Sequence, residues 1–214
     1  MKDKIKIDIV SDVVCPWCTI GFKRLEKAIS EMGVEDQVEI EWQPFELNPN
    51  MPAEGESVLE HIAKKYGASL EDQKRSQESM TQFGAALGFK FDYFDEMKVV
   101  NTRDAHILLE YAKEFGKQTE LKMRFMAAFF SERKDISNRK ILLQELESIG
   151  LNVAEAQAKL IDKEAHEEIK TKEAYWKNMG ISSVPTIVFN REGMITGAQP
   201  VAVFKQVLSQ LLQQ

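Results

Sequence analysis

The stretch IKIDIVSDVVCPWC at residues 5–18 decides the fold, because it joins a strand to a helix through a pair of cysteines. Residues 5–10 are rich in β-branched side chains and are followed by polar residues, which is typical of a buried strand and a turn. From Pro16 onward, apolar residues recur at near-helical spacing as far as Gly33, which is placed to cap a helix. The stretch therefore predicts a strand, a turn that holds both cysteines, and a helix.

Two further regions extend this pattern. Residues 38–42 alternate apolar residues with glutamate, which predicts a second strand and a βαβ opening. Strand patterns return at residues 186–189 and 194–196, on either side of a turn, and indicate a β-hairpin. Pro200 then opens a final amphipathic helix. The two ends of the chain are therefore expected to form one α/β domain.

The long middle region is predicted to be helical. Four of the six prolines lie at or before Pro52 and the next is Pro185, so residues 53–184 contain none. Apolar residues recur there with helical spacing, and patterns such as Asn152 with Glu155 can start new helices. The sequence thus predicts an all-helical insertion that splits the α/β domain. We place the first part of the α/β domain, the insertion and the second part at residues 1–52, 53–178 and 179–214.

Composition argues against two classes of partner. The chain has 214 residues, 43% of them hydrophobic, which suffices for a well-packed core. Its net charge of −6 at pH 7 repels a phosphate backbone, so we expect no nucleic-acid partner. No stretch approaches the roughly 20 apolar residues of a membrane span, and residues 1–10 lack a signal-peptide core. We therefore expect a cytoplasmic protein with no membrane partner.

The two cysteines carry the predicted chemistry. No other cysteines occur in the sequence, and these two lie only three positions apart, so they cannot cross-link distant parts of a fold. At the start of a helix, unpaired backbone N–H groups and the helix dipole stabilise a thiolate, which is the nucleophile in disulfide exchange. We expect Cys15 to attack a disulfide and Cys18 to resolve the mixed disulfide. Because Trp17 adds no charge and Asp12 opposes the thiolate, we expect a moderate lowering of the Cys15 pKa.

Half a zinc site and an inert or incidental cysteine pair are the competing interpretations. Zinc normally needs four ligands, and the other candidates are scattered acids and three histidines, His61, His106 and His166. A purely structural disulfide does not persist in a reducing cytosol. We therefore expect a redox pair and no metal.

A second motif, Ser-Val-Pro-Thr at residues 183–186, lies just before the later strand. Proline is tolerated at the first residue of a strand, so a strand start is the simplest interpretation. A cis bond between Val184 and Pro185 is the alternative, and its pairing with Cys-x-x-Cys in a βαβ context favours it.

Together these motifs resemble the DsbA-like thioredoxin superfamily, and in particular its FrnE branch. The similarity rests on four stretches, Cys-Pro-Trp-Cys at 15–18, Asn-Thr-Arg-Asp-Ala-His at 101–106, Ser-Val-Pro-Thr at 183–186 and Gly-Ala-Gln-Pro at 197–200. The resemblance implies a thioredoxin-like domain (βαβ…ββα) interrupted by a helical domain, with a cis-proline loop facing Cys15. It also implies thiol–disulfide oxidoreductase activity on disulfide-bearing proteins or small thiols, with a thiol recycling partner and no bound cofactor.

On these grounds the expected substrate-binding residues are Pro16, Trp17, Val184, Pro185 and His106. Trp17 must sit at an exposed turn and can offer apolar contact to a substrate. Val184 is expected to offer its backbone N–H and C=O to an extended substrate strand. For His106, the surface of a helix is the simplest interpretation, and a position over the thiols is the alternative.

Two other functions are compatible with parts of the sequence. A glutathione-dependent transferase or isomerase of the kappa-class or chromene-carboxylate type is one, although those relatives usually carry serine at the Cys15 position and need no resolving thiol such as Cys18. A peptide-binding holdase is the non-enzyme alternative, and it would tolerate the loss of both cysteines. Trp17 stands where periplasmic oxidases of the superfamily often carry histidine, so oxidase, reductase and isomerase directions stay open.

Overall fold

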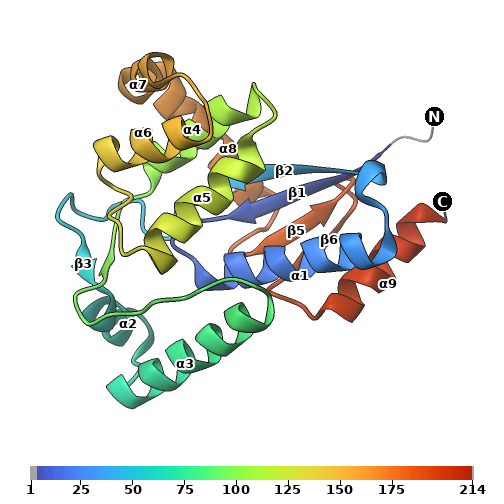
Figure 1. Ribbon diagram of the computed structural model, residues 1–214, viewed down its shortest axis with the longest axis horizontal. Helices are drawn as coiled ribbons and strands as arrows, with labels where there is room; N and C mark the ends of the chain where they lie inside the picture. Colours follow the sequence, from blue (N-terminus) through green and yellow to red (C-terminus); the bar gives the residue numbers. More distant parts are fainter. Residues whose placement is uncertain (1–3, 214) are drawn as a thin grey trace.

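The computed structural model describes residues 4–213 and contains a four-stranded sheet with helices on both sides (Figure 1). Residues 1–3 and 214 lie outside this range. They belong to the predicted domain ends, and residues 1–3 also belong to the segment that is predicted to lack a signal peptide. The elements of the α/β part are β1 (Ile5–Ser11), α1 (Pro16–Met32), a short 3-10 helix (Glu35–Gln37), β2 (Val38–Pro44), β5 (Thr186–Phe189), β6 (Gly193–Thr196) and α9 (Val201–Leu212). The predicted βαβ opening and ββα ending are confirmed.

The sheet has the strand order β2-β1-β5-β6, which makes β1 a central strand. β1 runs parallel to β2 and antiparallel to β5, and β5 and β6 form the predicted hairpin. Ile7 and Ile9 of β1 pack into a core with α1 and α9, whereas Val10 packs into a smaller core with Trp176 of α8. Both faces of β1 are covered, so its C-terminal end is held firmly in place. The loop of residues 12–15, called the cysteine loop below, begins at that end.

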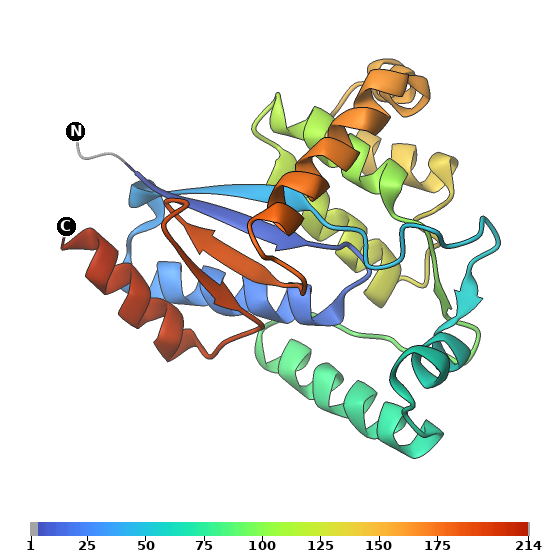
Figure 2. The same ribbon diagram turned by 180° about the vertical axis from the view of Figure 1, so that it is seen from behind.

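The insertion between β2 and β5 is mainly helical. Its helices are α2 (Val58–Tyr66), α3 (Leu70–Ala86), α4 (Arg103–Lys113), α5 (Gln118–Ser131), α6 (Arg139–Ser148), α7 (Val153–Ile161) and α8 (Lys163–Asn178). It also contains two paired two-residue strands, β3 (Glu56–Ser57) and β4 (Lys98–Val99). Figures 1 and 2 show α2 and α3 lying apart from α4–α8, close to the start of α1. Asn152 caps α7 as predicted, since its side chain accepts from the N–H groups of Ala154 and Glu155.

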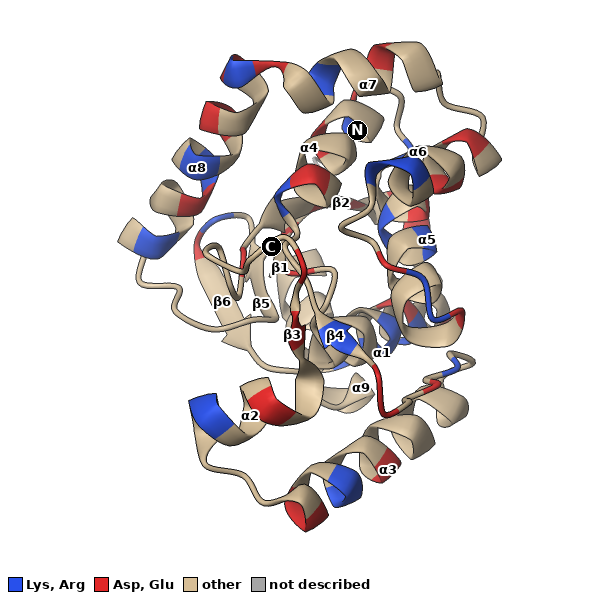
Figure 3. Ribbon diagram, turned by 90° about the vertical axis from the view of Figure 1, so that its left-hand side faces the viewer, with Lys and Arg blue, Asp and Glu red and all other residues tan. Residues whose placement is uncertain are grey.

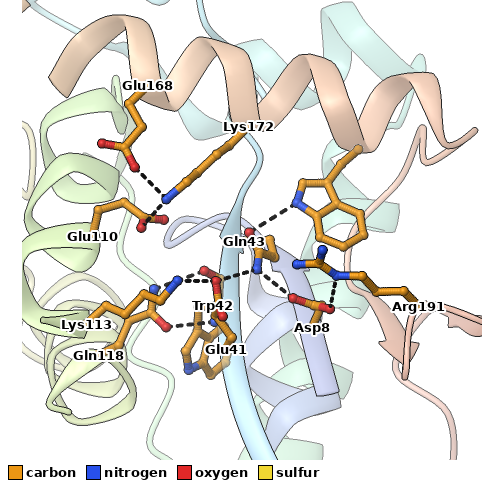
Figure 4. Close-up of polar contacts among 11 residues, drawn as sticks. Asp8, Glu41, Trp42, Gln43, Glu110, Lys113, Gln118, Glu168, Lys172 and Arg191 are labelled. Atoms are coloured by element: carbon orange, nitrogen blue, oxygen red, sulfur yellow. Dashed lines mark hydrogen bonds and ion pairs between the residues drawn. The ribbon is translucent and has the colours of Figure 1, made fainter. Parts of the chain in front are cut away.

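The free edge of β2 is covered by side chains of the insertion (Figure 4). The Gln118 carboxamide of α5 accepts from the Trp42 N–H at 2.8 Å and donates to the Trp42 carbonyl at 3.0 Å, as a neighbouring strand would. On the same strand, Gln43 donates to buried Asp8 at 2.6 Å. The two Gln118 contacts satisfy backbone groups that would otherwise leave β2 an exposed edge strand, and they fix the insertion to the sheet.

The insertion and the cysteine loop share one apolar core, which includes Cys15, Cys18, Leu108 and Phe125. By contrast, α8 carries lysines and glutamates along its length (Figure 3), and Glu164, Glu167 and Glu168 are exposed. Helices α4 and α5 pack against the cysteine loop and can therefore place side chains next to it. The exposed face of α8 is solvated. The domain boundaries at residues 52 and 178 stay a prediction.

Candidate active site

Both cysteines lie at the junction of β1 and α1, as the sequence predicts. Cys15 is the N-cap residue of α1 and Pro16 occupies the first turn, where its missing N–H costs nothing. Cys18 follows one turn along, with its N–H bonded to the Cys15 carbonyl at 3.1 Å. Both are free thiols; Cys15 is 5% exposed and Cys18 is fully buried. Cys15 is therefore the one that a substrate reaches first.

The predicted cis bond between Val184 and Pro185 is present, and its loop faces the cysteines. The Cys15 Sγ lies 3.9 Å from the Val184 carbonyl oxygen. On the other side, a Cβ on Gly21 of α1 would stand only 3.1 Å from the Pro185 Cγ. Glycine at this position lets the helix approach the proline loop closely.

Asp12 forms a buried polar centre beneath the thiols. Its carboxylate accepts from the N–H groups of Val13 at 2.7 Å and Leu47 at 2.8 Å, and lies 3.3 Å from the Nε2 of His106. Burial acts to raise the Asp12 pKa, but the hydrogen bond and charge of His106, the Leu47 N–H and the Lys122 charge outweigh it and lower the pKa. Asp12 is therefore held as a carboxylate next to the cysteine pair.

His106 lies inside the protein rather than on the surface of a helix, so the simplest interpretation of this residue is wrong. It sits on α4 and is 2% exposed, because α4 packs its apolar face against the cysteine loop and α5. A buried histidine that bonds to Asp12 has no route to direct substrate contact. Its effect on the thiols must pass through Asp12.

Lys122 of α5 is fully buried beneath the same loop. Its Nζ lies 3.5 Å from the Ser11 carbonyl oxygen and 5.1 Å from the centroid of the Trp42 ring. Burial lowers the Lys122 pKa from the ordinary 10.5 to about 8, although negative charge on Cys18, Asp12 and Cys15 acts to raise it. Lys122 therefore holds a positive charge close to the thiols at neutral pH.

The two thiols titrate as a pair, because their sulfurs hydrogen-bond to each other. The hydrogen bond to Cys18, together with burial and the negative charges of Cys18 and Asp12, raises the Cys15 pKa. Burial acts to raise the Cys18 pKa as well, but hydrogen bonds from Cys15 and the Ser11 hydroxyl and the charge of Lys122 lower it. The expected lowering of the Cys15 pKa is thus not found: the pKa of Cys15 is raised, and it is the pKa of Cys18 that is lowered.

The motif at residues 101–106 anchors α4 next to this centre. Arg103 forms an ion pair with the buried Glu46, and Asp104 pairs with Arg139 at 2.7 Å. Burial raises the Glu46 pKa, and the Arg103 hydrogen bond only partly offsets this effect. These contacts hold the start of α4, and so hold His106 at Asp12.

A pocket of about 540 Å³ opens beside Cys15, between the cysteine loop and helices α2, α3 and α5. Four of the predicted site residues line it, namely Cys15, Pro16, Trp17 and Val184. Trp17 is 39% exposed, as predicted, although it lies in the first turn of α1 and not in a turn ahead of the helix, and it packs near Phe83 of α3. Cys18, Pro185 and His106 are not among the residues that line the pocket, and all three are buried.

Within residues 4–213, no three histidine, cysteine, aspartate or glutamate side chains converge as a metal site would require. No helix in the same range is long and apolar enough to cross a membrane.

The family model for the DSBA-like thioredoxin domain matches residues 6–209. The chain belongs to the DSBA-like thioredoxin domain family. The predicted α/β fold of this family, a thioredoxin-like domain with a helical insertion, is confirmed. The chain is similar to the crystal structure of a probable DsbA oxidoreductase from Streptomyces coelicolor, with a TM-score of 0.91 and 31% sequence identity. The match covers 98% of this chain and 91% of the Streptomyces chain.

Two further relatives are more distant. The uncharacterized protein YwbO of Bacillus subtilis is 29% identical over 208 residues, which is 96% of either chain. The cytosolic disulfide reductase DsbM of Pseudomonas aeruginosa, solved with GSH, has a TM-score of 0.68 at 17% identity, covering 98% of this chain and 100% of that one. At that identity DsbM shares the DSBA-like fold and shows nothing further about this chain.

Sequence reasoning missed the buried position of Lys122 beneath the cysteine loop. One signal was available, because Gln118 and Lys122 lie one turn apart on a helix whose neighbouring positions, such as Phe125 and Phe129, are apolar. Polar residues on the buried face of a helix require partners, and here the partners are the edge of β2 and the cysteine loop.

Proposed function

We propose that this protein is a cytoplasmic thiol–disulfide oxidoreductase of the FrnE type that acts on protein disulfides. One observation carries the proposal: a free Cys15–Cys18 pair at the start of α1, with Cys15 beside both the Val184 carbonyl and an open pocket. Membership of the DSBA-like family supports this chemistry. The cytoplasmic location is supported by the two cysteines being local to one site, with no structural disulfide elsewhere in the sequence.

In the reducing direction, Cys15 attacks one sulfur of the substrate disulfide as a thiolate. A bond forms between Cys15 and that sulfur, the substrate S–S bond breaks, and the other substrate sulfur leaves as a thiolate. Cys18 then attacks the Cys15 sulfur, so the internal disulfide forms and the second substrate sulfur leaves. The cysteine pair loses two electrons and the substrate gains two, while the protons of the thiols pass to the released sulfurs. A thiol recycling partner returns the pair to its reduced form.

The shared charge of the pair prepares this first step. Because the pKa of Cys18 is lowered and that of Cys15 is raised, Cys18 ionises before Cys15, and its thiolate accepts the hydrogen bond of the Cys15 thiol. When a substrate reaches the more exposed Cys15, transfer of its proton to the Cys18 thiolate produces the attacking Cys15 thiolate, and no base from solvent is needed. Cys18 loses the same proton before it resolves the mixed disulfide, and it does so close to the positive charge of Lys122.

Two buried charges act in opposite directions on the redox couple. Lys122 stabilises a thiolate and therefore favours the reduced form, whereas the Asp12 carboxylate opposes a thiolate. With both present, we propose a reduction potential between those of thioredoxin and a strong oxidase, which suits a reductase or an isomerase.

The Val184 backbone provides the binding edge. An extended substrate strand that pairs with Val184 would bring its disulfide to Cys15, which lies 3.9 Å from the Val184 carbonyl oxygen. Pro16 and Trp17 flank this position on the surface of the pocket.

The proposed direction is tested by equilibrating the protein in glutathione buffers and measuring the fraction of oxidised Cys15–Cys18 pair. We expect a potential between about −270 and about −120 mV, the values for thioredoxin and a strong oxidase. A pair that does not exchange with glutathione at all would contradict the oxidoreductase assignment. A double variant, Cys15→Ser with Cys18→Ser, distinguishes an oxidoreductase from a holdase. A holdase would keep its peptide-binding activity without either thiol, whereas an oxidoreductase would lose disulfide exchange.

A further inference from the structure

Ser11, the last residue of β1, is fully buried beneath the second cysteine. Side chains alternate between the two faces of a strand, so Ser11 lies on the same face as Ile7 and Ile9, which pack against α1. Cys18 belongs to α1, and its sulfur forms a hydrogen bond with the Ser11 hydroxyl. A neutral side chain of β1 is therefore in direct contact with the sulfur that resolves the mixed disulfide.

The Ser11 hydroxyl is only weakly engaged elsewhere. Its oxygen lies 3.4 Å from the Asp12 carbonyl oxygen, well beyond the roughly 2.7–2.8 Å of a typical O–H···O bond. A hydroxyl hydrogen rotates to suit its surroundings, and a bond to an ionised acceptor is about twice as strong as one to a neutral acceptor. When Cys18 is a thiolate, the Ser11 hydroxyl is therefore expected to donate to its sulfur.

Lys122 reaches the same cluster from α5. Ile9 pairs with Trp42 across β1 and β2, so the Trp42 ring lies on the face of the sheet that α1 covers. The Lys122 Nζ lies 5.1 Å from the centroid of this ring and 3.5 Å from the Ser11 carbonyl oxygen. Neither partner carries a charge, so the ammonium charge stays available to a thiolate. Burial lowers the Lys122 pKa, and Cys18 is the largest of the charges that act to raise it.

Two other titratable residues lie next to Cys18. The Cys15 thiol donates a hydrogen bond to the Cys18 sulfur, and the Asp12 backbone N–H donates another. The Asp12 carboxylate is directed to His106, at 3.3 Å from the Nε2. Once Cys15 is bonded to a substrate sulfur, it has no hydrogen to donate. Formation of the mixed disulfide therefore removes one donor from Cys18 just before Cys18 must ionise.

We propose that the Ser11 hydroxyl and the Lys122 ammonium group together bind the Cys18 thiolate during the resolving step, which makes Ser11 a catalytic residue. In this step Cys18 loses its proton to solvent, and its sulfur forms a bond to the Cys15 sulfur. The bond between Cys15 and the substrate breaks, and its electron pair leaves with the substrate sulfur, which then takes up a proton. This inference rests on the proposed disulfide-exchange activity and names the groups that serve its second step.

The test uses dithiodipyridine, an uncharged disulfide that releases one light-absorbing thiopyridone on attack by Cys15 and a second on resolution by Cys18. At reagent concentrations that no longer change its rate, the second release reports the resolving step alone. Stopped-flow traces over a range of pH then give the pH midpoint of that step.

Ser11→Ala should raise this midpoint by about one pH unit, the size expected for one hydrogen bond to a charged group. A less acidic thiolate is also a stronger nucleophile, so the two effects oppose each other. The resolving rate should fall about 3- to 4-fold well below the midpoint and rise about 3-fold well above it. A merely structural role of Ser11 would not produce this crossover.

Two further variants test the site independently. Lys122→Met retains the Ser11 hydroxyl and removes the charge, so it should shift the midpoint in the same direction. Thr19→Val is the matched control. Thr19 follows Cys18 directly and is fully buried, but its hydroxyl donates to the Met126 sulfur at 3.2 Å. Loss of this hydroxyl should leave the wild-type midpoint unchanged.

A wild-type midpoint in Ser11→Ala or in Lys122→Met would overturn the inference while leaving the disulfide-exchange activity in place. A resolving rate that falls by the same factor at every pH would equally overturn it, because a displaced cysteine and not a lost donor would then be the cause. A wild-type protein that releases no thiopyridone, or never releases the second equivalent, would instead contradict the proposed function itself.

Discussion

Replacement of Lys122 by methionine should stabilise the protein and impair its redox chemistry together. The Lys122 side chain is fully buried, and burial brings its pKa from 10.5 to about 8. The difference of about 2.5 pKa units, at about 1.36 kcal/mol each, corresponds to about 3 kcal/mol of unfavourable free energy for holding the charge inside the fold. Loss of the contacts with the Trp42 ring and the Ser11 carbonyl offsets part of this gain, so Lys122→Met should be about 1–3 kcal/mol more stable at pH 7.

The difference in the free energy of unfolding between Lys122→Met and the wild type should depend on pH. Below pH 8 the lysine is charged in both folded and unfolded chains, and the full penalty is present. Between pH 8 and 10.5 the folded protein releases this proton while the unfolded chain keeps it, so the stability contribution of Lys122 rises with pH. The methionine variant lacks that rise. Its advantage over the wild type should therefore shrink as the pH increases through this window.

Lys122 also stabilises negative charge on Cys18, so its loss should raise the pKa of the thiol pair. The reduced form loses that stabilisation and the disulfide does not, which makes the couple more reducing by about 30 mV for every 1.4 kcal/mol. Urea unfolding of both redox forms and a glutathione titration measure these two effects. Lys140→Met, at an exposed position of α6, is the control and should change neither by more than about 0.5 kcal/mol. A Lys122→Met protein with lower stability at pH 7 and an unchanged potential would refute the reasoning.

Three further predictions concern the support of the site. Gln118→Leu leaves the Trp42 N–H and C=O of edge strand β2 without partners and should cost about 2–4 kcal/mol in urea unfolding; a loss below 0.5 kcal/mol would contradict this role. His106→Leu removes the hydrogen bond that lowers the Asp12 pKa, so the stability that the Asp12 carboxylate provides should be lost at a higher pH than in the wild type. Acid unfolding followed by circular dichroism measures this shift, and an unchanged acid midpoint would contradict it. Gly21→Ala places a Cβ about 3.1 Å from the Pro185 Cγ and should slow peptide-disulfide exchange through displacement of the proline loop, whereas an unaltered rate would mean that the loop adapts freely.

Local patterns were sufficient to predict most of the α/β part. The start of α1 at Pro16, its end before Gly33 and the hairpin at residues 186–196 each depend on turn or cap residues that act within a few positions. The thiol pair and the proline loop were also predictable, because a short motif specifies each of them. Their approach, with the Cys15 sulfur 3.9 Å from the Val184 oxygen, follows from the fold of the family.

The buried environment of the thiols was not predictable from local patterns. His106 and Lys122 lie 94 and 111 positions from their partners Asp12 and Ser11, so helical periodicity carries no information about these contacts. The raised Cys15 pKa has this origin only in part, since its largest cause is the hydrogen bond to Cys18, three positions away, and burial adds to it. Tertiary packing of α4 and α5 decides where His106 and Lys122 lie.

The central claim, that Cys15 attacks substrate disulfides and Cys18 resolves the product, is tested most directly by trapping. Cys18→Ala retains the attacking thiol and removes the resolving one, so incubation with a peptide disulfide should accumulate one mixed disulfide per protein at Cys15, identified by intact mass and peptide mapping. Cys15→Ser should accumulate none under the same conditions, because Cys18 is fully buried. Adducts on Cys18 in Cys15→Ser, together with none in Cys18→Ala, would contradict the account and reverse the two roles.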